Sequence, residues 1–449
     1  MSALVCLGRH TVTGLLATSG SQFRDWSAAY RLFARERFDM QKVFDQILTG
    51  VIDLLDQDAP LVVALDDTLL RKKGTRTHGV SWRRDPLGPA FRHNLIRGQR
   101  VLQLSAALPS PEGHARMVPV DLVHAPSPKK PRKSAHPEQW RVYRQACQQS
   151  NLGRVATGCL DRLRKRIDQN PKEKGRRVLI VGDGGFTNGT VMKDMPPNMT
   201  FIGRLRADAK LYQLPGQPAA TSRGRRRIYG PPAPTPEQIR QSETIPWRYV
   251  RVHAAGKWHL FRIKTVSPLR WRATSNHHNL RLVVIAPLSY RPRKGSRLLY
   301  RKPAYLICTD TELPLDQLIQ AYVWRWDIEV NFRDEKTLLG LGQAQVRNQH
   351  SVETLPQLIV AAYAAMLLAA ARTYGIDGSP KELPPPKWRR NGAKQRTTTN
   401  DLINQMRAEL WGRALGLGNL SDFVTTNHEQ MKSQKNRPDL KSAVLYACN

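Results

Sequence analysis

The apolar residues at the start of the chain recur with the period of an α-helix. From residue 1 to residue 58 this pattern predicts amphipathic helices around Phe23–Arg35 and Met40–Leu55, and no segment alternates between apolar and polar positions. Several arginines lie in these helices, which suits a small helical module that contacts DNA. A helical cap that only packs against the rest of the protein is the alternative.

A different pattern begins at Leu61–Leu65, where consecutive apolar residues predict a short buried strand. The elements predicted after it are strands at Val101–Leu108, Met117–His124, Val178–Val181 and Met199–Leu205, a long helix at Pro137–Asp168, and a short helix after Val181. Strands that alternate with helices predict an α/β core. We assign residues 59–205 to its first part.

The pattern changes again at residue 206. Residues 206–310 are rich in Pro, Gly and Arg, and their apolar residues alternate with polar ones, which predicts a β-rich insertion. Its clearest strand candidates are Trp247–His253, Trp258–Thr265 and Leu280–Ile285. Helix resumes near Leu315 in a segment at 311–350. The C-terminal region, 351–449, is predicted to be helical with an interruption at Pro384–Pro386.

The charge of the chain indicates its partner. Seventy-one Lys and Arg residues stand against 36 Asp and Glu, which gives a formal charge of +35. The basic residues are spread along the whole length, and no lipidation motif or basic amphipathic anchor accompanies them, so nucleic acid is the expected partner rather than a membrane. The longest apolar run, Leu358–Ala371, is too short to span a bilayer and predicts a buried helix.

The remaining composition favours a reducing compartment. The five cysteines are widely separated and form no C-x-x-C pair, which argues against a zinc site and against a disulfide framework. Arg9 and His10 interrupt the short apolar start, so we expect no signal peptide. A cytoplasmic protein fits these observations best.

Three acidic residues are candidates for catalysis. Asp66 and Asp183 each follow a predicted buried strand, and strand ends are where α/β sheets place ligands, while Glu329 lies on a predicted helix. Carboxylates without His or Cys partners suit Mg²⁺ or Mn²⁺, and beside a polyanion they suggest phosphoryl transfer with two metal ions roughly 4 Å apart. The alternatives are an Asx turn or helix cap at either aspartate, and Asp67 in place of Asp66.

The helix that contains Glu329 has an unusual charged face. At the helical period, the residues that fall on one arc are Tyr322, Arg325, Glu329, Arg333 and Lys336. The residues on the opposite flank, which we expect to pack inward, are Trp324, Ile328, Phe332 and Leu339. Asp327 falls outside the charged arc. A solvated face braced by an Arg325–Glu329 ion pair is the alternative interpretation.

The order Asp, Asp, then Tyr-x2-Arg-x3-Glu-x6-Lys resembles the bacterial insertion-sequence transposases of the DDE type that carry the YREK signature. The signature residues in this chain are Tyr322, Arg325, Glu329 and Lys336. The Asp-x-Thr context of Asp66 resembles the first-strand motif of that family and favours Asp66 over Asp67. Gly-Gly-Phe after Asp183, and the basic segment Gly203–Arg206, also resemble the family, as does a β-rich insertion before the Glu.

This resemblance implies an RNase H-like catalytic core and cut-and-paste movement of a DNA element with inverted-repeat ends. It implies two Mg²⁺ or Mn²⁺ ions held by Asp66, Asp183 and Glu329. The residues it places on DNA are Tyr322, Arg325, Lys336, Arg333, Arg204 and Arg206. Family members nick the strand whose 3′-OH is later joined to target DNA, and several form a hairpin at the transposon end.

The resemblance also implies double-stranded DNA ends and target DNA as partners, a homodimer in the synaptic complex, and a place near the bacterial nucleoid. Family members stack a flipped base on a tryptophan of the insertion, for which Trp247, Trp258 and Trp271 are candidates. Three other functions stay open: a domesticated relative that binds DNA without cleaving it, a nuclease or resolvase of the same fold, and a basic nucleoid-type protein. A domesticated relative would still bind DNA. The YREK helix argues against a nuclease or resolvase, and a nucleoid-type protein would explain the charge but not the three acidic residues.

Overall fold

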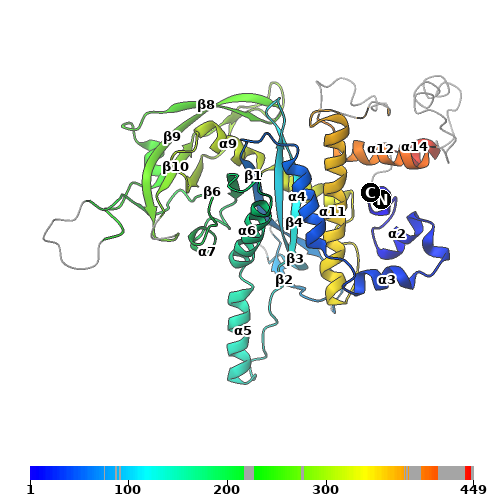
Figure 1. Ribbon diagram of the computed structural model, residues 1–449. Coiled ribbons are helices and arrows are strands. Elements are labelled where there is room, and N and C mark those ends of the chain that lie inside the picture. Colours follow the sequence, from blue (N-terminus) through cyan, green and yellow to red (C-terminus); the bar gives the residue numbers. More distant parts are fainter. Residues whose placement is uncertain are drawn as a thin grey trace.

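One large mixed sheet forms the centre of the molecule, with helices on both faces (Figure 1). The structure is a computed structural model that describes the chain except residues 75, 86–87, 90–92, 217–226, 275–277, 379, 381–382, 384–395, 413–439 and 446–449. Within the described residues the sheet has eleven strands. The mixed α/β class predicted from the sequence is confirmed.

Five strands make up the part of the sheet that carries the candidate acids. They are β1 (Leu61–Arg71), β3 (Leu95–Pro109), β4 (Ala115–His124), β5 (Val178–Gly182) and β6 (Met199–Arg204). β1 is parallel to β5, and β5 is parallel to β6, whereas β3 is antiparallel to β1 and β4 is antiparallel to β3. The spatial order β4-β3-β1-β5-β6 is the RNase H-like arrangement.

The β-rich insertion extends this same sheet. β13 pairs with β6, and the order continues through β10 and β9 to β7, with β8 on the far part of β9. The elements of the insertion are β7 (Leu211–Tyr212), α8 (Pro236–Gln241), β8 (Arg248–Ala254), β9 (Lys257–Trp271), β10 (Leu280–Ile285), β11 (Ser289–Tyr290), β12 (Leu299–Tyr300) and β13 (Ala304–Cys308). The insertion is thus joined to the catalytic sheet by backbone hydrogen bonds along β6.

Successive side chains of a strand point to opposite faces, and this alternation divides the core in two. On one face Val63 and Ile180 pack in a cluster with the apolar residues of α4 (Met40–Ile52) and α6 (Leu152–Gln169). On the other face Ala64 and Val181 pack with α9 (Leu315–Trp324) and α10 (Asp327–Thr337). Of the residues predicted to pack inward, Ile328 and Phe332 are buried in this second cluster and Trp324 is half-buried against it, whereas Leu339, beyond α10, is buried in the first cluster.

The N-terminal region is helical, as predicted. Its elements are α1 (Ser2–Val5), α2 (Val12–Thr18), the short 3₁₀ helix η1 (Ser21–Phe23), α3 (Ser27–Ala34) and α4. Phe44, Leu48 and Val51 of α4 are buried in the same cluster as α6 and β1. The last helix of this region therefore belongs to the packing of the catalytic sheet.

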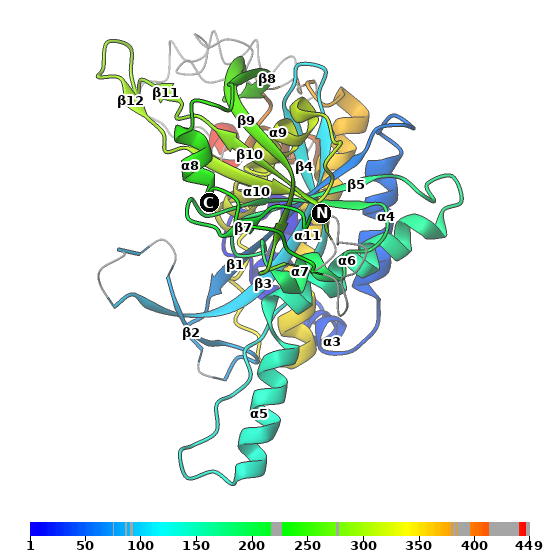
Figure 2. The same ribbon diagram turned by 90° about the vertical axis from the view of Figure 1, so that its left-hand side faces the viewer.

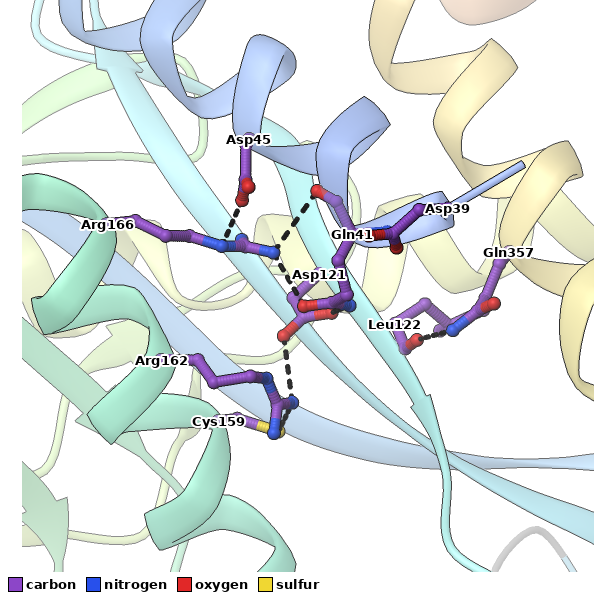
Figure 3. Close-up of polar contacts among 9 residues, drawn as sticks. All are labelled: Asp39, Gln41, Asp45, Asp121, Leu122, Cys159, Arg162, Arg166 and Gln357. Carbon is purple, nitrogen blue, oxygen red and sulfur yellow. Dashed lines mark hydrogen bonds and ion pairs between the residues drawn. The ribbon is translucent and has the colours of Figure 1, made fainter. Parts of the chain in front are cut away.

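A buried polar network fixes α4 in place (Figure 3). Arg166 of α6 contacts Asp45 and donates to the side-chain oxygen of Gln41 at 2.6 Å, and Gln41 in turn donates to Asp121 of β4 at 3.2 Å. Arg162 donates to the second oxygen of Asp121 at 3.2 Å. Because Asp121 is only 2% exposed, losing Arg162 would leave a buried charge without its cation, and losing Gln41 would remove a hydrogen bond from it.

Two predicted helices are each divided by the structure. The single helix predicted over Pro137–Asp168 is in fact α5 (Pro137–Gln149) and α6, because Asn151 caps α6 by accepting a hydrogen bond from the N–H of Gly153 at 2.9 Å. The single charged helix around Tyr322–Lys336 is divided between α9 and α10. A strand that the sequence analysis missed, β2 (Ser81–Arg84), pairs with β3 as a hairpin.

The C-terminal region begins with α11 (Gln349–Tyr374), whose length and mean hydropathy of 1.7 would suffice to cross a membrane. Two thirds of its most apolar window is buried within the protein, against α4 and β4, so the prediction of a buried helix is confirmed. α12 (Thr399–Trp411) and α14 (Leu440–Leu445) follow. The interruption predicted at Pro384–Pro386 lies outside the described residues. The domain boundaries predicted from the sequence stay a prediction.

Candidate active site

Asp66 and Asp67, the two adjacent acids of β1, point to opposite faces of the sheet. Asp66 shares the face of Ala64, where α9 and α10 pack, and it contacts Arg325. Asp67 shares the face of Val63 and Leu65 and accepts a hydrogen bond at 2.6 Å from Arg100 of β3. The two carboxylates thus belong to different environments although they are neighbours in the chain.

Arg325 joins Asp66 to Glu329. Its Nη1 lies 3.2 Å from Asp66 Oδ2, and its Nη2 lies 3.3 Å from Glu329 Oε1. Arg325 and Trp326 lie between α9 and α10, where hydrogen bonds from Ile328 and Glu329 reach back only three residues, so the regular α-helix is interrupted there. The Arg325–Glu329 ion pair of the alternative interpretation is present, but Arg325 is only 12% exposed and also contacts Asp66, so the three residues form a triad rather than a solvated face.

Burial dominates the electrostatics of this triad. It raises the pKa of Asp66 to about 7, with the negative charge of Asp183 adding to the effect and the Arg325 guanidinium opposing it. The side chains of Asp66 and Arg325 are only 16% and 12% exposed. One guanidinium shared between two acids does not neutralise the site, which therefore favours an additional cation.

Asp183 follows β5 in a tight turn beside Asp66. Its Oδ1 accepts hydrogen bonds from the backbone N–H groups of Gly185, at 2.8 Å, and Phe186, at 3.3 Å, which is the Asx turn that the sequence left open. Its Oδ2 has no hydrogen-bond partner among the described residues. The turn packs closely on β6, because a Cβ on Gly203 would lie 2.2 Å from Thr187 Oγ1.

The second cation of the signature, Lys336, contacts the same strand. Its Nζ lies 2.5 Å from the Oγ1 of Thr68, two residues beyond Asp66 and hence on the same face. Burial lowers the pKa of Lys336. Tyr322 is half-buried, with its ring centre 6.0 Å from the Arg325 guanidinium. Arg325 and Lys336 therefore both attach α9 and α10 to the Asp-x-Thr stretch of β1.

Two charged residues of this segment lie elsewhere. Arg333, predicted on the same arc, is 65% exposed and pairs with the adjacent Asp334 at 2.8 Å rather than with Asp66 or Glu329. Asp327, predicted to lie free of the arc, pairs with Arg396 at 2.5 Å. Arg333 therefore departs from the predicted arc contacts, whereas Asp327 lies away from the Asp66–Arg325–Glu329 group, as predicted.

The closest group of metal-type ligands in the described residues is a different one. Glu112, His114 and Asp377 bring one ligand atom each within 4.8 Å of one another, whereas Asp66, Asp183 and Glu329 stay further apart with Arg325 between two of them. His114 Nε2 lies 2.9 Å from an oxygen of Asp377, and burial lowers the pKa of His114. This second group lies apart from the proposed catalytic acids.

A cavity of about 590 Å³ adjoins the Asp183 turn. Gly184 and Asn188 of the turn line it, together with Arg204 and Arg206 at the end of β6 and Trp271 at the end of β9. Of the tryptophans considered, Trp271 alone lines this cavity. Trp247 lies under Arg262 and Lys264, and Trp258 lies under Arg251 at the other end of β9.

Comparison with known families agrees with this geometry. Residues 1–265, more than half of the chain, match the family described as DDE superfamily endonuclease. The chain belongs to this family. No curated protein is detectably similar to it.

Membership of the DDE superfamily endonucleases fixes the coarse chemistry. These enzymes have an RNase H-like catalytic domain, use divalent metal ions and act on DNA. Asp66 and Asp183 lie inside the matched residues, whereas Glu329 lies beyond them, so its assignment depends on the contact with Arg325.

The donors of this endonuclease fit a hard divalent cation. All of them are carboxylate oxygens, and burial raises the pKa of Asp66 although the Arg325 guanidinium opposes the shift, so the anionic form of Asp66 would gain from a further cation. Asp66, Asp183 and Glu329 would hold the metal. It would activate the attacking oxygen and stabilise the leaving one, which is the chemistry a divalent ion supplies in phosphoryl transfer.

The sequence analysis missed three residues that shape the site of this endonuclease. Thr68 was noted only as part of a motif, Gly203 only as the start of a basic segment, and Arg100 not at all. The period of two along β1 could have assigned Thr68 to the face of Asp66. Nothing local in the sequence shows that Gly203 lies against Thr187 or that Arg100 reaches Asp67.

Proposed function

We propose that this endonuclease is a DNA transposase of the insertion-sequence type, which cleaves the ends of its element and joins them to target DNA. The observation that carries the proposal is the Asp66–Arg325–Glu329 triad beside Asp183. It brings residues 259 positions apart into one buried polar site, in the middle of β1 and beside the end of β5. It also gives a structural role to Arg and Lys of the YREK pattern, because both contact the Asp-x-Thr strand.

The chain's own residues supply positioning and charge. Asp66, Asp183 and Glu329 face the phosphate that reacts, as ligands of two Mg²⁺ or Mn²⁺ ions. The Nε of Arg325 is buried and has no partner among the described residues, so a phosphate oxygen can accept its hydrogen bond. Tyr322, Lys336 and the exposed Arg333 would hold neighbouring phosphates of the transposon end.

The cavity beside Asp183 suits the displaced part of the DNA strand. Arg204 and Arg206 supply positive charge at its rim, although Arg206 also pairs with Asp208 at 3.0 Å. Trp271 supplies an aromatic surface on which a base can stack. We therefore favour Trp271 over Trp247 and Trp258 as the residue that receives a flipped base.

Transposition adds requirements beyond cleavage. Joining both ends calls for a synaptic homodimer that binds two inverted repeats and the target duplex, in a bacterial cytoplasm close to the nucleoid. The charge of +35 supports binding to a polyanion of this size. A domesticated protein that binds ends without cleaving them is the second candidate, supported by Arg325, which already occupies the space between two of the proposed metal ligands.

Cleavage of DNA that carries the inverted repeats flanking the gene separates the two candidates. The wild-type protein should nick this DNA in Mg²⁺ and not in EDTA, and Glu329→Ala should stop nicking while leaving binding of the ends intact or stronger. If the wild type binds ends but does not cut them in Mg²⁺ or Mn²⁺, the domesticated function is correct. Normal cleavage by Glu329→Ala would place the third ligand elsewhere.

A further inference from the structure

A second polar cavity lies on the opposite face of β1 from Asp66. Its volume is about 320 Å³, and it opens where the β2–β3 hairpin meets the junction of α5 and α6. The side chains that line it and matter here are Arg83, Arg100, Ser127, Cys147 and Asn151. The proposed catalytic residues are absent from its lining.

The two arginines of this cavity are not fully neutralised. Arg100 donates to Asp67, but Arg83 donates only to the uncharged hydroxyl of Ser127, and its buried Nε has no partner among the described residues. Burial and the nearby charge of Arg100 both lower the pKa of Arg83. Two guanidiniums and one carboxylate leave one positive charge uncompensated, which an anion would neutralise.

The α6 helix adds to this preference for an anion. Ser150, Asn151 and Leu152 at its first turn line the cavity, and α6 is 18 residues long. A helix N-terminus carries partial positive charge and unpaired N–H groups, so it favours a negatively charged ligand.

A positively charged arm extends outward from the cavity. α5 projects from the body in both views (Figures 1 and 2), and in Figure 2 the β2–β3 hairpin extends from the body in a different direction. None of the α5 residues is buried, so the helix gains little from apolar packing. Between residues 129 and 144 one acid, Glu138, accompanies six exposed cations: Lys129, Lys130, Arg132, Lys133, Arg141 and Arg144.

We propose that the Arg83–Arg100 cavity and the α5 arm bind the phosphate backbone of duplex DNA outside the catalytic centre. The chemistry of the cavity fits a phosphodiester, and the charge of the arm fits further phosphates along the same duplex. Arg100 connects the two regions, because its partner Asp67 directly follows Asp66 on β1. The inference rests on the proposed function, in that DNA is taken as the substrate.

Cys147 provides a direct reporter of this surface. It is a free thiol that lines the cavity and is half-buried, whereas the other free cysteines of the described residues, Cys6, Cys159 and Cys308, are buried. Alkylation at Cys147, followed by peptide mass mapping, measures whether the cavity is covered. Duplex DNA without divalent metal should slow this alkylation several-fold, and inorganic phosphate at equal phosphate concentration should not.

Substitution tests which charges are responsible. Arg83→Gln should reduce the protection of Cys147 and lower the log–log salt dependence of duplex binding by about 0.9, the value for one lost phosphate contact. Arg144→Gln, in an exposed position on α5, should do the same without risk to folding, and Arg83→Lys should retain part of the effect. Arg177→Gln is the matched control, because Arg177 is an exposed, ion-paired arginine at the other end of β5.

The possible outcomes separate this inference from the proposed function. If DNA is cleaved normally while Cys147 is alkylated at an unchanged rate, the inference is wrong and the proposed function stands. The same conclusion follows if Arg83→Gln and Arg144→Gln bind DNA with the salt dependence of Arg177→Gln. If the wild type binds no duplex in low salt, both proposals fail together. Protection by inorganic phosphate alone would show a small-anion site and overturn the assignment to DNA.

Discussion

The two faces of β1 contain adjacent aspartates with opposite surroundings. Asp66 lies in a buried site with an arginine that comes from far along the chain, and its pKa is raised to about 7. Asp67 lies beside the adjacent strand, in an ion pair with Arg100 next to a cavity and an extended basic arm. The first environment concentrates uncompensated negative charge, and the second concentrates uncompensated positive charge.

This difference indicates a division of labour along one strand. Negative charge in a dry site favours metal ions, whereas positive charge on an open surface favours phosphates. Because side chains alternate along a strand, two consecutive residues can serve both purposes without neutralising each other. The comparison predicts that substitutions on the two faces will have different kinds of effect.

The largest effect should come from the two aspartates themselves. Asp66→Ala should reduce Mg²⁺-dependent cleavage of end DNA by about three orders of magnitude or more, because it removes a proposed metal ligand. Asp67→Ala should leave cleavage largely intact and strengthen duplex binding, because it frees the Arg100 guanidinium. Cleavage rates and gel-shift affinities of both variants measure this, and an inactive Asp67→Ala with an active Asp66→Ala would reverse the assignment.

The next largest effect should come from Arg325. Arg325→Lys keeps the charge but loses the fork that reaches both Asp66 and Glu329, so cleavage should fall about a hundredfold. On the other face, Arg100→Lys should change the cleavage rate little, because the ion pair with Asp67 uses a single contact. Single-turnover rates at saturating protein isolate this effect from binding. Equal losses in the two variants would mean that the faces are not functionally distinct.

The sequence predicted the chemistry of these faces better than their geometry. The strands that carry Asp66 and precede Asp183 were found because buried parallel strands are continuous apolar runs. The first was predicted to end at Leu65 but continues to Arg71, so Asp66 lies inside β1. The break between α9 and α10 was not predicted, since the helical pattern continues through it without Gly or Pro. Asp327 was placed outside the charged arc, but its ion pair with Arg396, from a region 69 residues away, had no signal in the sequence.

Contacts between distant segments account for the other differences. The break between α5 and α6 had a local signal, because Asn151 is a typical N-cap residue. The Arg83–Arg100 cavity had none, since it forms only where the hairpin, the linker after β4 and α6 meet. A charge count predicted binding to DNA but not the part of the surface that binds it.

The two faces of the sheet should also differ in how they make stability depend on pH. Glu335, on the same side of the sheet as Asp66, is fully buried, and burial raises its pKa to about 8, with a hydrogen bond from Gln103 opposing the shift. Both raised acids contribute stability that is fully present below their unfolded pKa values and is lost as pH rises through about 7 and 8. Between the unfolded and the folded pKa of each group, the free energy of unfolding falls by about 1.4 kcal/mol per pH unit.

Glu335→Gln should therefore flatten the decline in stability between pH 5 and pH 9. Asp67→Asn, on the other face, should leave the slope as it is in the wild type. Denaturant midpoints at several pH values without divalent metal measure both. A wild-type protein equally stable at pH 5 and pH 9 would show that the buried acids of this face do not control its stability.

The smallest of these effects should come from Thr68, which shares the face of Asp66. Thr68→Val keeps the shape of the side chain but removes the oxygen that lies 2.5 Å from Lys336 Nζ, which leaves a half-buried ammonium without that partner. We expect a loss of about 2 kcal/mol in the free energy of unfolding, typical of a hydrogen bond to a charged group. Thr337→Val, on the exposed side of α10, is the control and should cost less than about 0.5 kcal/mol.

Because Lys336 is retained, a loss of cleavage beyond the loss of stability would show that Thr68 positions Lys336 on the DNA as well as anchoring α10. No change in either quantity would mean that the Asp-x-Thr stretch is not held by the signature helix, and that the face of Asp66 is organised by Arg325 alone.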